Sequence, residues 1–287
     1  MKLQLDTTVQ IHRLLNRSDD TVNQRLESLK ESAESVEAST YSKKEYSFSV
    51  LKDCCTMLAR VTRTKSLKDA LDFIGRYGSY KKRFHTRMLT IMWKFFLQGQ
   101  IKGDWKDYDE NRRDEILGEE FARFLRIYIP VLWESFEEGL VLPLQNRTKC
   151  PFAHKEPKDN GRTFELNIKI KCKESDGCAL TNLIMGERAR CLKLLDKLME
   201  LEDREKTEEL KKIQFVLEKF FEGGDKGICY EKCNQGIGDL IIAIETHTNR
   251  TLVTTNARES RIISPAIGQE HIIIPVKETS TEVVQSV

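Results

Sequence analysis

The sequence predicts an α/β fold in which helices flank a parallel sheet, with a large and mostly helical insertion in the middle of the chain. Short strand patterns occur near both ends, as "LQLD" and "VEAST" at the start and "RTLVTTN" and "HIIIPV" at the finish. Neither end has enough strands to form a sheet alone, so strands from both ends must share one sheet. The residues between them follow helical periodicity for most of their length.

The N-terminal elements alternate between strand and helix. After "LQLD", a helical pattern begins near Val9, and "DDTVNQRLESLKESAES" predicts a second helix with Asp19 or Asp20 at its cap. "VEAST" predicts the second strand. The next helix, "SKKEYSFSVLKDCCTMLARV", is expected to begin at Ser42, because Glu45 follows at the S-x-x-E spacing of a capping box.

The middle of the chain predicts helices separated by one irregular region. "SLKDALDFIGRYG" and "FHTRMLTIMWKFFLQG" are amphipathic, and the charged stretch 104–139 is helical with a kink or break at Pro130. Proline and glycine punctuate residues 143–180, where "TFELNIKIKC" alternates like a strand. The stretch 187–224 predicts a return to helix, stopped by a glycine pair.

The C-terminal elements complete the predicted sheet. "GDLIIAIET" is a buried helix or strand, and a strand, a turn and a last strand follow it. We therefore expect residues 1–62 and 225–276 to form the α/β core and residues 63–224 to form the insertion. Residues 277–287 are polar and are expected to be a flexible tail.

Composition restricts the class of protein. The 287 residues include 47 basic and 45 acidic side chains, for a net charge of +2, so any basic surface must be local. No apolar run approaches the length that spans a bilayer, and no secretory signal is visible, so we expect a cytoplasmic protein with no membrane partner. Eight cysteines in that compartment are expected to be reduced or to bind metal.

Four polar residues are predicted to lie close together at the carboxyl edge of the sheet. Asp6 ends the first strand, Glu45 follows the second, Asp239 opens "DLIIAIE" and Asn256 follows "TLVTT". Ligands of parallel sheets gather at this edge. Carboxylates brought together repel one another, and Mg²⁺ or Mn²⁺, which prefer oxygen ligands, resolve that conflict. The pattern therefore indicates metal-assisted phosphodiester hydrolysis.

Each of these residues also has a structural interpretation. Asp6 and Asp239 are suited to cap the helices that follow them, Glu45 to complete a capping box and Asn256 to form a turn. The shared position of all four at the sheet edge favours the functional interpretation.

The segments "LQLDTTVQIHRLL", "EASTYSKKEYSFSVL", "GIGDLIIAIETHTNRTLVTTNARES" and "HIIIPV" resemble PIN-domain ribonucleases, a family that includes bacterial toxin–antitoxin nucleases. The resemblance covers residues 1–60 and 225–276. It implies that Asp6, Glu45 and Asp239 are metal ligands, and that Asn256 stands where the family often has a fourth acid. An asparagine there brings no charge.

The same resemblance implies further contacts and a function. Thr7 and Thr255 would orient water or phosphate, and Arg258 would contact phosphate. The chain would be a metal-dependent endoribonuclease, acting as a toxin or defence effector with a protein regulator or antitoxin. Apart from the resemblance, a homo-oligomer is a further expectation. The alternatives are a PIN-like protein that binds nucleic acid or a protein without cleaving, and a small-molecule phosphoesterase. Ordinary family members lack the stretch from Thr62 to Gly224.

Two features of the insertion suggest ligands of their own. The first is a zinc site in 148–180, since Zn²⁺ is bound by ligand sets of the type found at Cys150, His154, Cys172 and Cys178. Free cysteines in a loop are the equal alternative, and Cys54 and Cys55 are expected to pack as small hydrophobes.

The second feature is "RYGSYKKRFHTR", in which cations and aromatics interleave without an acid. Cations neutralise phosphates and aromatic faces stack on unpaired bases, so this stretch is expected to bind RNA. The alternative is a solvated helix junction. The cations concerned are Arg76, Lys81, Lys82, Arg83 and Arg87.

Overall fold

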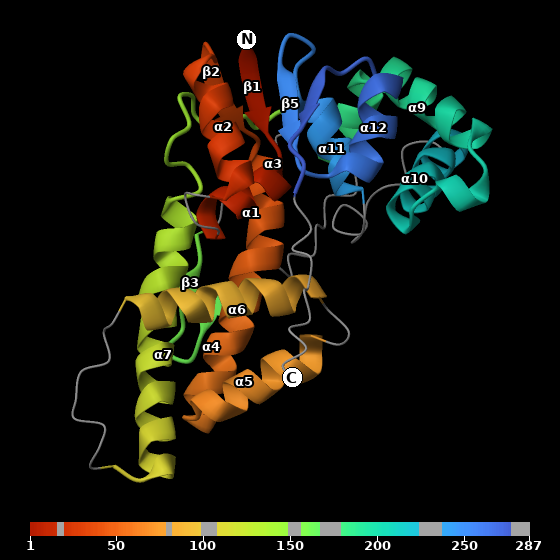
Figure 1. Ribbon diagram of the computed structural model, residues 1–287. Coiled ribbons are helices and arrows are strands. Elements are labelled where there is room, and N and C mark those ends of the chain that lie inside the picture. The colour runs from red at the N-terminus through yellow and green to blue at the C-terminus, as the bar shows by residue number, and fades with distance from the viewer. Residues whose placement is uncertain are drawn as a thin grey trace, which may run out of the picture.

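The computed structural model describes residues 1–15, 20–78, 82–98, 108–148, 156–166, 179–223 and 237–276. At its centre is a four-stranded parallel sheet of order β2-β1-β5-β6, with helices on both faces (Figure 1). The strands are β1 (Lys2–Leu5), β2 (Ser35–Ala38), β5 (Thr251–Thr254) and β6 (His271–Ile273). Strands from the two ends of the chain thus share one sheet, as predicted.

The sheet register aligns the carboxyl ends of the central strands. Leu5 of β1 pairs with Ala38 of β2 on one side and with Val253 of β5 on the other. The residues that follow these strands therefore emerge at one edge, and the functional candidates lie there.

Alternating side chains anchor the sheet to helices on its two faces. Leu3 and Leu5 are fully buried against α1 (Thr7–Leu15) and α2 (Thr21–Glu31), while Leu252 faces α11 (Gly238–Glu245) and α12 (Ala257–Ala266). Helix α2 begins where the sequence predicts, because the Asp20 side chain accepts a hydrogen bond from the Val22 amide at 2.9 Å.

The helix that carries Glu45 begins earlier than the sequence predicts. Helix α3 (Thr40–Tyr46) is capped by Ser39, whose hydroxyl accepts a hydrogen bond from the Ser42 amide at 3.0 Å. The capping-box interpretation of Ser42 and Glu45 is wrong, since Glu45 lies near the end of α3. A π-helical stretch, Ser47–Leu51, continues directly into α4 (Lys52–Thr64).

The first half of the insertion forms a helical group with α4. Helices α5 (Leu67–Gly78), α6 (Lys82–Leu97) and α7 (Glu110–Glu134) lie below the sheet in Figure 1 and share one apolar core with α4. Helix α7 is a single helix that includes Pro130, so the predicted break does not occur. A Cβ at Gly118 would lie 2.6 Å from the Lys65 carbonyl carbon, so only glycine allows α7 to approach the end of α4 this closely.

The second half of the insertion forms another helical group beside the sheet. It contains α8 (Ala179–Gly186), α9 (Arg188–Glu200), a 3₁₀ turn at Asp203–Glu205 and α10 (Glu208–Gly223). The helix predicted over 187–224 is therefore two helices. The interruption is stabilised by a capping box between Glu202 and Glu205.

Two further differences from prediction concern short elements. Helix α12 occupies the position where the sequence predicted only a turn, and it packs on α9 and α11 through Ile263 and Ile267. Of the strand predicted in "TFELNIKIKC", the described part is β4 (Phe164–Glu165), paired with β3 (Lys158–Asp159). Among the described helices, none has the length and apolar character needed to cross a membrane.

Candidate functional site

Three acidic residues from separate elements line one cleft of about 690 Å³. Asp6 follows β1, Glu45 lies in the last turn of α3, and Asp239 lies in the first turn of α11. Asn256, which follows β5 and precedes α12, lines the same cleft. The structure thus brings together the four residues that the sequence placed at the sheet edge, from both ends of the chain.

Asp6 is buried and accepts three short hydrogen bonds. Its Oδ1 accepts from the Thr7 amide at 2.6 Å, and its Oδ2 accepts from the hydroxyls of Thr8 at 2.7 Å and Thr254 at 2.6 Å. Burial raises the pKa of Asp6, while these hydrogen bonds oppose the rise. Because its carbonyl also accepts from the Gln10 amide, Asp6 caps α1 and faces the cleft at once.

Glu45 is held by a hydroxyl and by a glycine. The Thr7 Oγ1 donates to Glu45 Oε2 at 2.9 Å. The other carboxylate oxygen lies directly against Gly238, where any Cβ would overlap it. Burial, followed by the charge of Asp6, raises the pKa of Glu45 to about 7.

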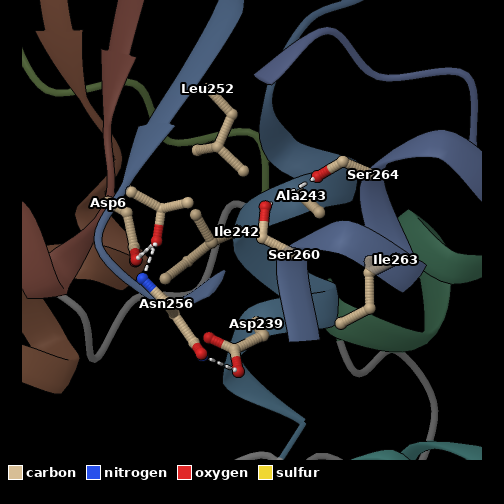
Figure 2. Close-up of a pocket in the computed structure, with 10 residues that line it drawn as sticks. Asp6, Asp239, Ile242, Ala243, Leu252, Asn256, Ser260, Ile263 and Ser264 are labelled. Atoms are coloured by element: carbon tan, nitrogen blue, oxygen red, sulfur yellow. Dashed lines mark hydrogen bonds between the residues drawn. The ribbon is translucent and has the colours of Figure 1, made fainter. Parts of the chain in front are cut away.

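Asn256 lies beside Asp6 and forms a hydrogen-bonded pair with Asp239 (Figure 2). The Asn256 Nδ2 donates to Asp239 Oδ2 at 2.9 Å, and the Asn256 amide donates to Thr254 Oγ1 at 2.9 Å. Asp239 does not cap α11, so the capping interpretation of Asp239 is wrong, whereas Asn256 does lie in the connection between β5 and α12. The pKa of Asp239 is raised well above its usual range by burial and then by the charges of Asp6 and Glu45.

The three acids supply the oxygen ligands that divalent cations prefer, although their carboxylate oxygens do not all lie within 4.8 Å of one another. Three carboxylates that are poorly solvated and repel one another give up protons reluctantly, and the charge of Lys44 offsets only part of this effect at Glu45; an ion such as Mg²⁺ or Mn²⁺ would offset the rest. The donor set consists of oxygen atoms, which matches the preference of these ions.

Two further acids near this site were not predicted from the sequence. Glu209 of α10 and Glu259 of α12 each place a carboxylate oxygen within 4.8 Å of Asp239 and of each other. Glu209 also lines the cleft. Nothing in the local sequence separates Glu209 from the other acids of its helix, and Glu259 was missed because α12 was not expected.

Basic residues of α6 also line the cleft. Lys82 and Arg83 are exposed there, and within the described ranges neither forms an ion pair. Arg87 also lines the cleft, but it is paired with Asp53 at 2.8 Å. Lys44, which the sequence analysis did not single out, is buried in the cleft wall with its ammonium 5.3 Å from the Tyr41 ring centroid.

The remaining predicted contacts differ in their placement. Thr255 lines the cleft, and its amide donates to the Thr8 hydroxyl at 3.2 Å. Arg76 on α5 and Arg258 on α12 are exposed and are not part of the cleft lining. Lys81 lies outside the described residues.

The predicted zinc ligands all lie outside the described residues; they are Cys150, His154, Cys172 and Cys178. Cys54 and Cys55 are buried free thiols in the core of the α4–α7 group, which confirms that they pack as small hydrophobes.

No family model, curated protein or solved structure matches this chain.

Proposed function

We propose that this protein is a PIN-like, metal-dependent endoribonuclease whose active site is the cleft at the carboxyl edge of the sheet. The observation that carries the proposal is the convergence of Asp6, Glu45 and Asp239 in one cleft with the basic side chains of α6. Acids that hold a divalent ion, facing cations that hold phosphate, are what hydrolysis of a phosphodiester requires.

The three acids would hold Mg²⁺ or Mn²⁺. When bound, such an ion neutralises charge on a phosphoryl group and makes water more acidic. Thr7 orients the Glu45 carboxylate through its hydroxyl, and Asn256 orients the Asp239 carboxylate through its amide. These two contacts fix the ligands before the ion arrives, which lowers the cost of ordering them.

RNA is proposed as the substrate because of the charge on α6. Lys82 and Arg83 lack acidic partners in the described chain and face the cleft, so they are available to phosphate oxygens. By resemblance alone, we also propose a role as a toxin or defence effector under a protein regulator.

The proposal is tested by incubating the full chain with labelled RNAs and Mn²⁺, with and without chelator. We expect cleavage that chelator abolishes and that Asp6→Asn and Asp239→Asn each reduce by about 100-fold or more. Glu208→Gln is the matched control, because Glu208 is an exposed acid of α10 outside the cleft lining. If the wild-type protein cleaves RNA no faster than the two aspartate variants, the proposed nuclease activity is refuted.

A second candidate, binding without cleavage, is favoured by one observation. The fourth position is Asn256, and its amide occupies an oxygen of Asp239 that an ion would otherwise use. RNA retention in a gel-shift assay without any Mn²⁺-dependent cleavage would support this candidate. Hydrolysis of simple diesters but not of RNA would instead indicate a small-molecule phosphoesterase.

A further inference from the structure

The cleft extends well beyond the acids. Its lining follows α1 from Thr7 to Leu15, a length of about 12 Å at the usual helical rise per residue. At that end α6 crosses α1 (Figure 1), and the Lys94 Nζ donates to the Leu14 carbonyl at 2.9 Å. The cleft volume of about 690 Å³ is that of a site for a whole small molecule, so a metal ion and one phosphate fill only part of it.

Apolar side chains and hydroxyls line the part of the cleft that adjoins α6. We call this part the α6 end, and its members are Ile11, Leu15, Phe48, Thr86 and Thr90. Arg87 also lines the cleft, but Asp53 neutralises it at 2.8 Å. Burial lowers the pKa of His12, another lining residue, so its imidazole is mostly uncharged at pH 7. The α6 end therefore suits an uncharged group with apolar faces.

The hydroxyls of Thr86 and Thr90 can only accept hydrogen bonds from a ligand. The Thr86 Oγ1 donates to the Lys82 carbonyl at 3.1 Å, and the Thr90 Oγ1 donates to the Thr86 carbonyl at 3.0 Å. A hydroxyl has one proton and two lone pairs, so each of these groups offers the cleft an acceptor alone. A ligand that is recognised here presents N–H or O–H donors to α6.

The order of residues along α6 places these two acceptors next to a site for phosphate. Arg83 lies close enough to Glu209 to oppose the rise in the pKa of that acid, so Arg83 is on the acidic side of the cleft. Thr86 and Thr90 follow Arg83 along the helix, and Thr90 lies about 10 Å beyond it. One nucleotide spans that length, so a nucleotide with its phosphate at Arg83 places its base at the α6 end.

We propose that the α6 end binds an unpaired nucleobase that carries an exocyclic amino group, as adenine and cytosine do. The amino group donates to Thr86 or Thr90, while Ile11 and Phe48 contact the faces of the base. Hypoxanthine and uracil carry a carbonyl oxygen in place of the amino group, and the two threonines have no proton to give it. This base site rests on the proposed function and adds to it the bases next to which RNA is cut.

Mononucleotide binding in the presence of chelator tests the base site without any cleavage. The full chain is titrated with the monophosphates of adenosine and inosine, and then with those of cytidine and uridine, and the affinities are measured by calorimetry. Within each pair, the amino group of the first base is a carbonyl in the second. We expect the amino form to bind about tenfold more tightly or better in at least one pair. Equal affinities in both pairs, a preference for the carbonyl forms, or no binding of any of the four would overturn the base site.

Removal of the two acceptors gives a variant that loses selectivity without losing all affinity. Thr86→Val combined with Thr90→Val keeps the shape of both side chains, so we expect it to bind the carbonyl forms as the wild type does and the amino forms no better than those. A misfolded protein would bind neither form. Selectivity retained by the double variant would overturn the proposal.

Thr56→Val is the matched control for the double variant. Thr56 is an exposed threonine of α4 outside the cleft lining, and its hydroxyl donates to its own helix in the same way, to the Lys52 carbonyl at 2.8 Å. We expect this variant to keep the selectivity of the wild type.

The base site and the nuclease activity can fail separately. Mn²⁺-dependent RNA cleavage together with equal affinities in both nucleotide pairs would refute the base site and leave the proposed function intact. Selective binding of the amino forms by a protein that cuts no RNA would support the base site and refute the nuclease activity.

Discussion

Replacing Glu45 tests whether the buried acids of the cleft destabilise the folded protein. Replacing it by glutamine removes a charge while keeping the shape of the side chain and an oxygen that accepts from Thr7. In the metal-free protein, we expect Glu45→Gln to be more stable than the wild type at pH 8. Loss of a proposed metal ligand should therefore stabilise the fold.

The magnitude follows from the pKa of Glu45, which the fold raises from 4.5 to about 7. The folded state thus binds this proton more tightly than the unfolded state does. Its stabilising effect is complete below pH 4.5 and is lost as the pH rises towards 7. Since each tenfold change in a protonation equilibrium is worth about 1.4 kcal/mol, the ionised carboxylate costs the folded state at most about 3.5 kcal/mol at pH 8. Solvent in the cleft screens part of this cost.

Urea unfolding in the presence of chelator measures the effect. The free energy of unfolding of Glu45→Gln should exceed that of the wild type by about 1–3 kcal/mol at pH 8, and by less than about 1 kcal/mol at pH 5. Glu208→Gln serves as the control, because Glu208 is exposed and its replacement should change little at either pH. Saturating Mn²⁺ should reverse the order, since an ion that binds only the folded wild type stabilises it.

The reasoning would be refuted if Glu45→Gln lowered stability at pH 8, or if its gain were the same at pH 5 and pH 8. Either result would mean that burial and the neighbouring acids do not penalise the Glu45 charge.

Two other changes probe the same cleft from its floor and from its basic wall. Gly238→Ala places a methyl group where the Glu45 carboxylate lies, so we expect the Mn²⁺ affinity measured by calorimetry to fall by about tenfold or more. Gly75→Ala is the control, because a Cβ at Gly75 meets open space. Equal Mn²⁺ affinities of the two variants would contradict the placement of Glu45 against Gly238. Arg83→Glu should weaken RNA binding measured by fluorescence anisotropy and make it less dependent on salt concentration, because one phosphate contact is lost. Lys68→Glu is the control, because Lys68 is an exposed residue of α5 outside the cleft lining, and it should leave RNA binding unchanged. An identical dependence of RNA affinity on salt in the two variants would exclude contact between α6 and RNA.

Much of the sheet was predictable because strand patterns are local. "LQLD" and "RTLV" are short runs whose side chains are buried on both faces of the sheet, and they appear as β1 and β5. Helix α12 was not predictable in this way. Its segment "ARESRIISPA" is polar in its first half and contains Pro265, and its helical state depends on Ile263 and Ile267 packing against α9 and α11.

Glu45 was predicted to lie in the first turn of its helix, and this prediction is wrong because the helix begins earlier. The sequence offered Ser42 and Glu45 as a capping box, but Ser39 caps the helix and places Glu45 three residues further along it. Ser39 and Ser42 are both residue types that cap helices, so the sequence alone does not choose between them. The residue at which β2 ends makes the choice.

The sequence by itself determined that acids follow strands at both ends of the chain, and strand and helix periodicity sufficed to place Asp6, Asp239 and Asn256 at the edge of one sheet. Only the tertiary structure decided that α10 brings Glu209 to that edge and that α6 brings Arg83 into the lining of the same cleft. Glu208 and Glu209 are identical neighbours in the sequence. What separates them is the burial of Leu210 and Ile213, which fixes the rotation of α10 and so determines which of the two acids faces Asp239.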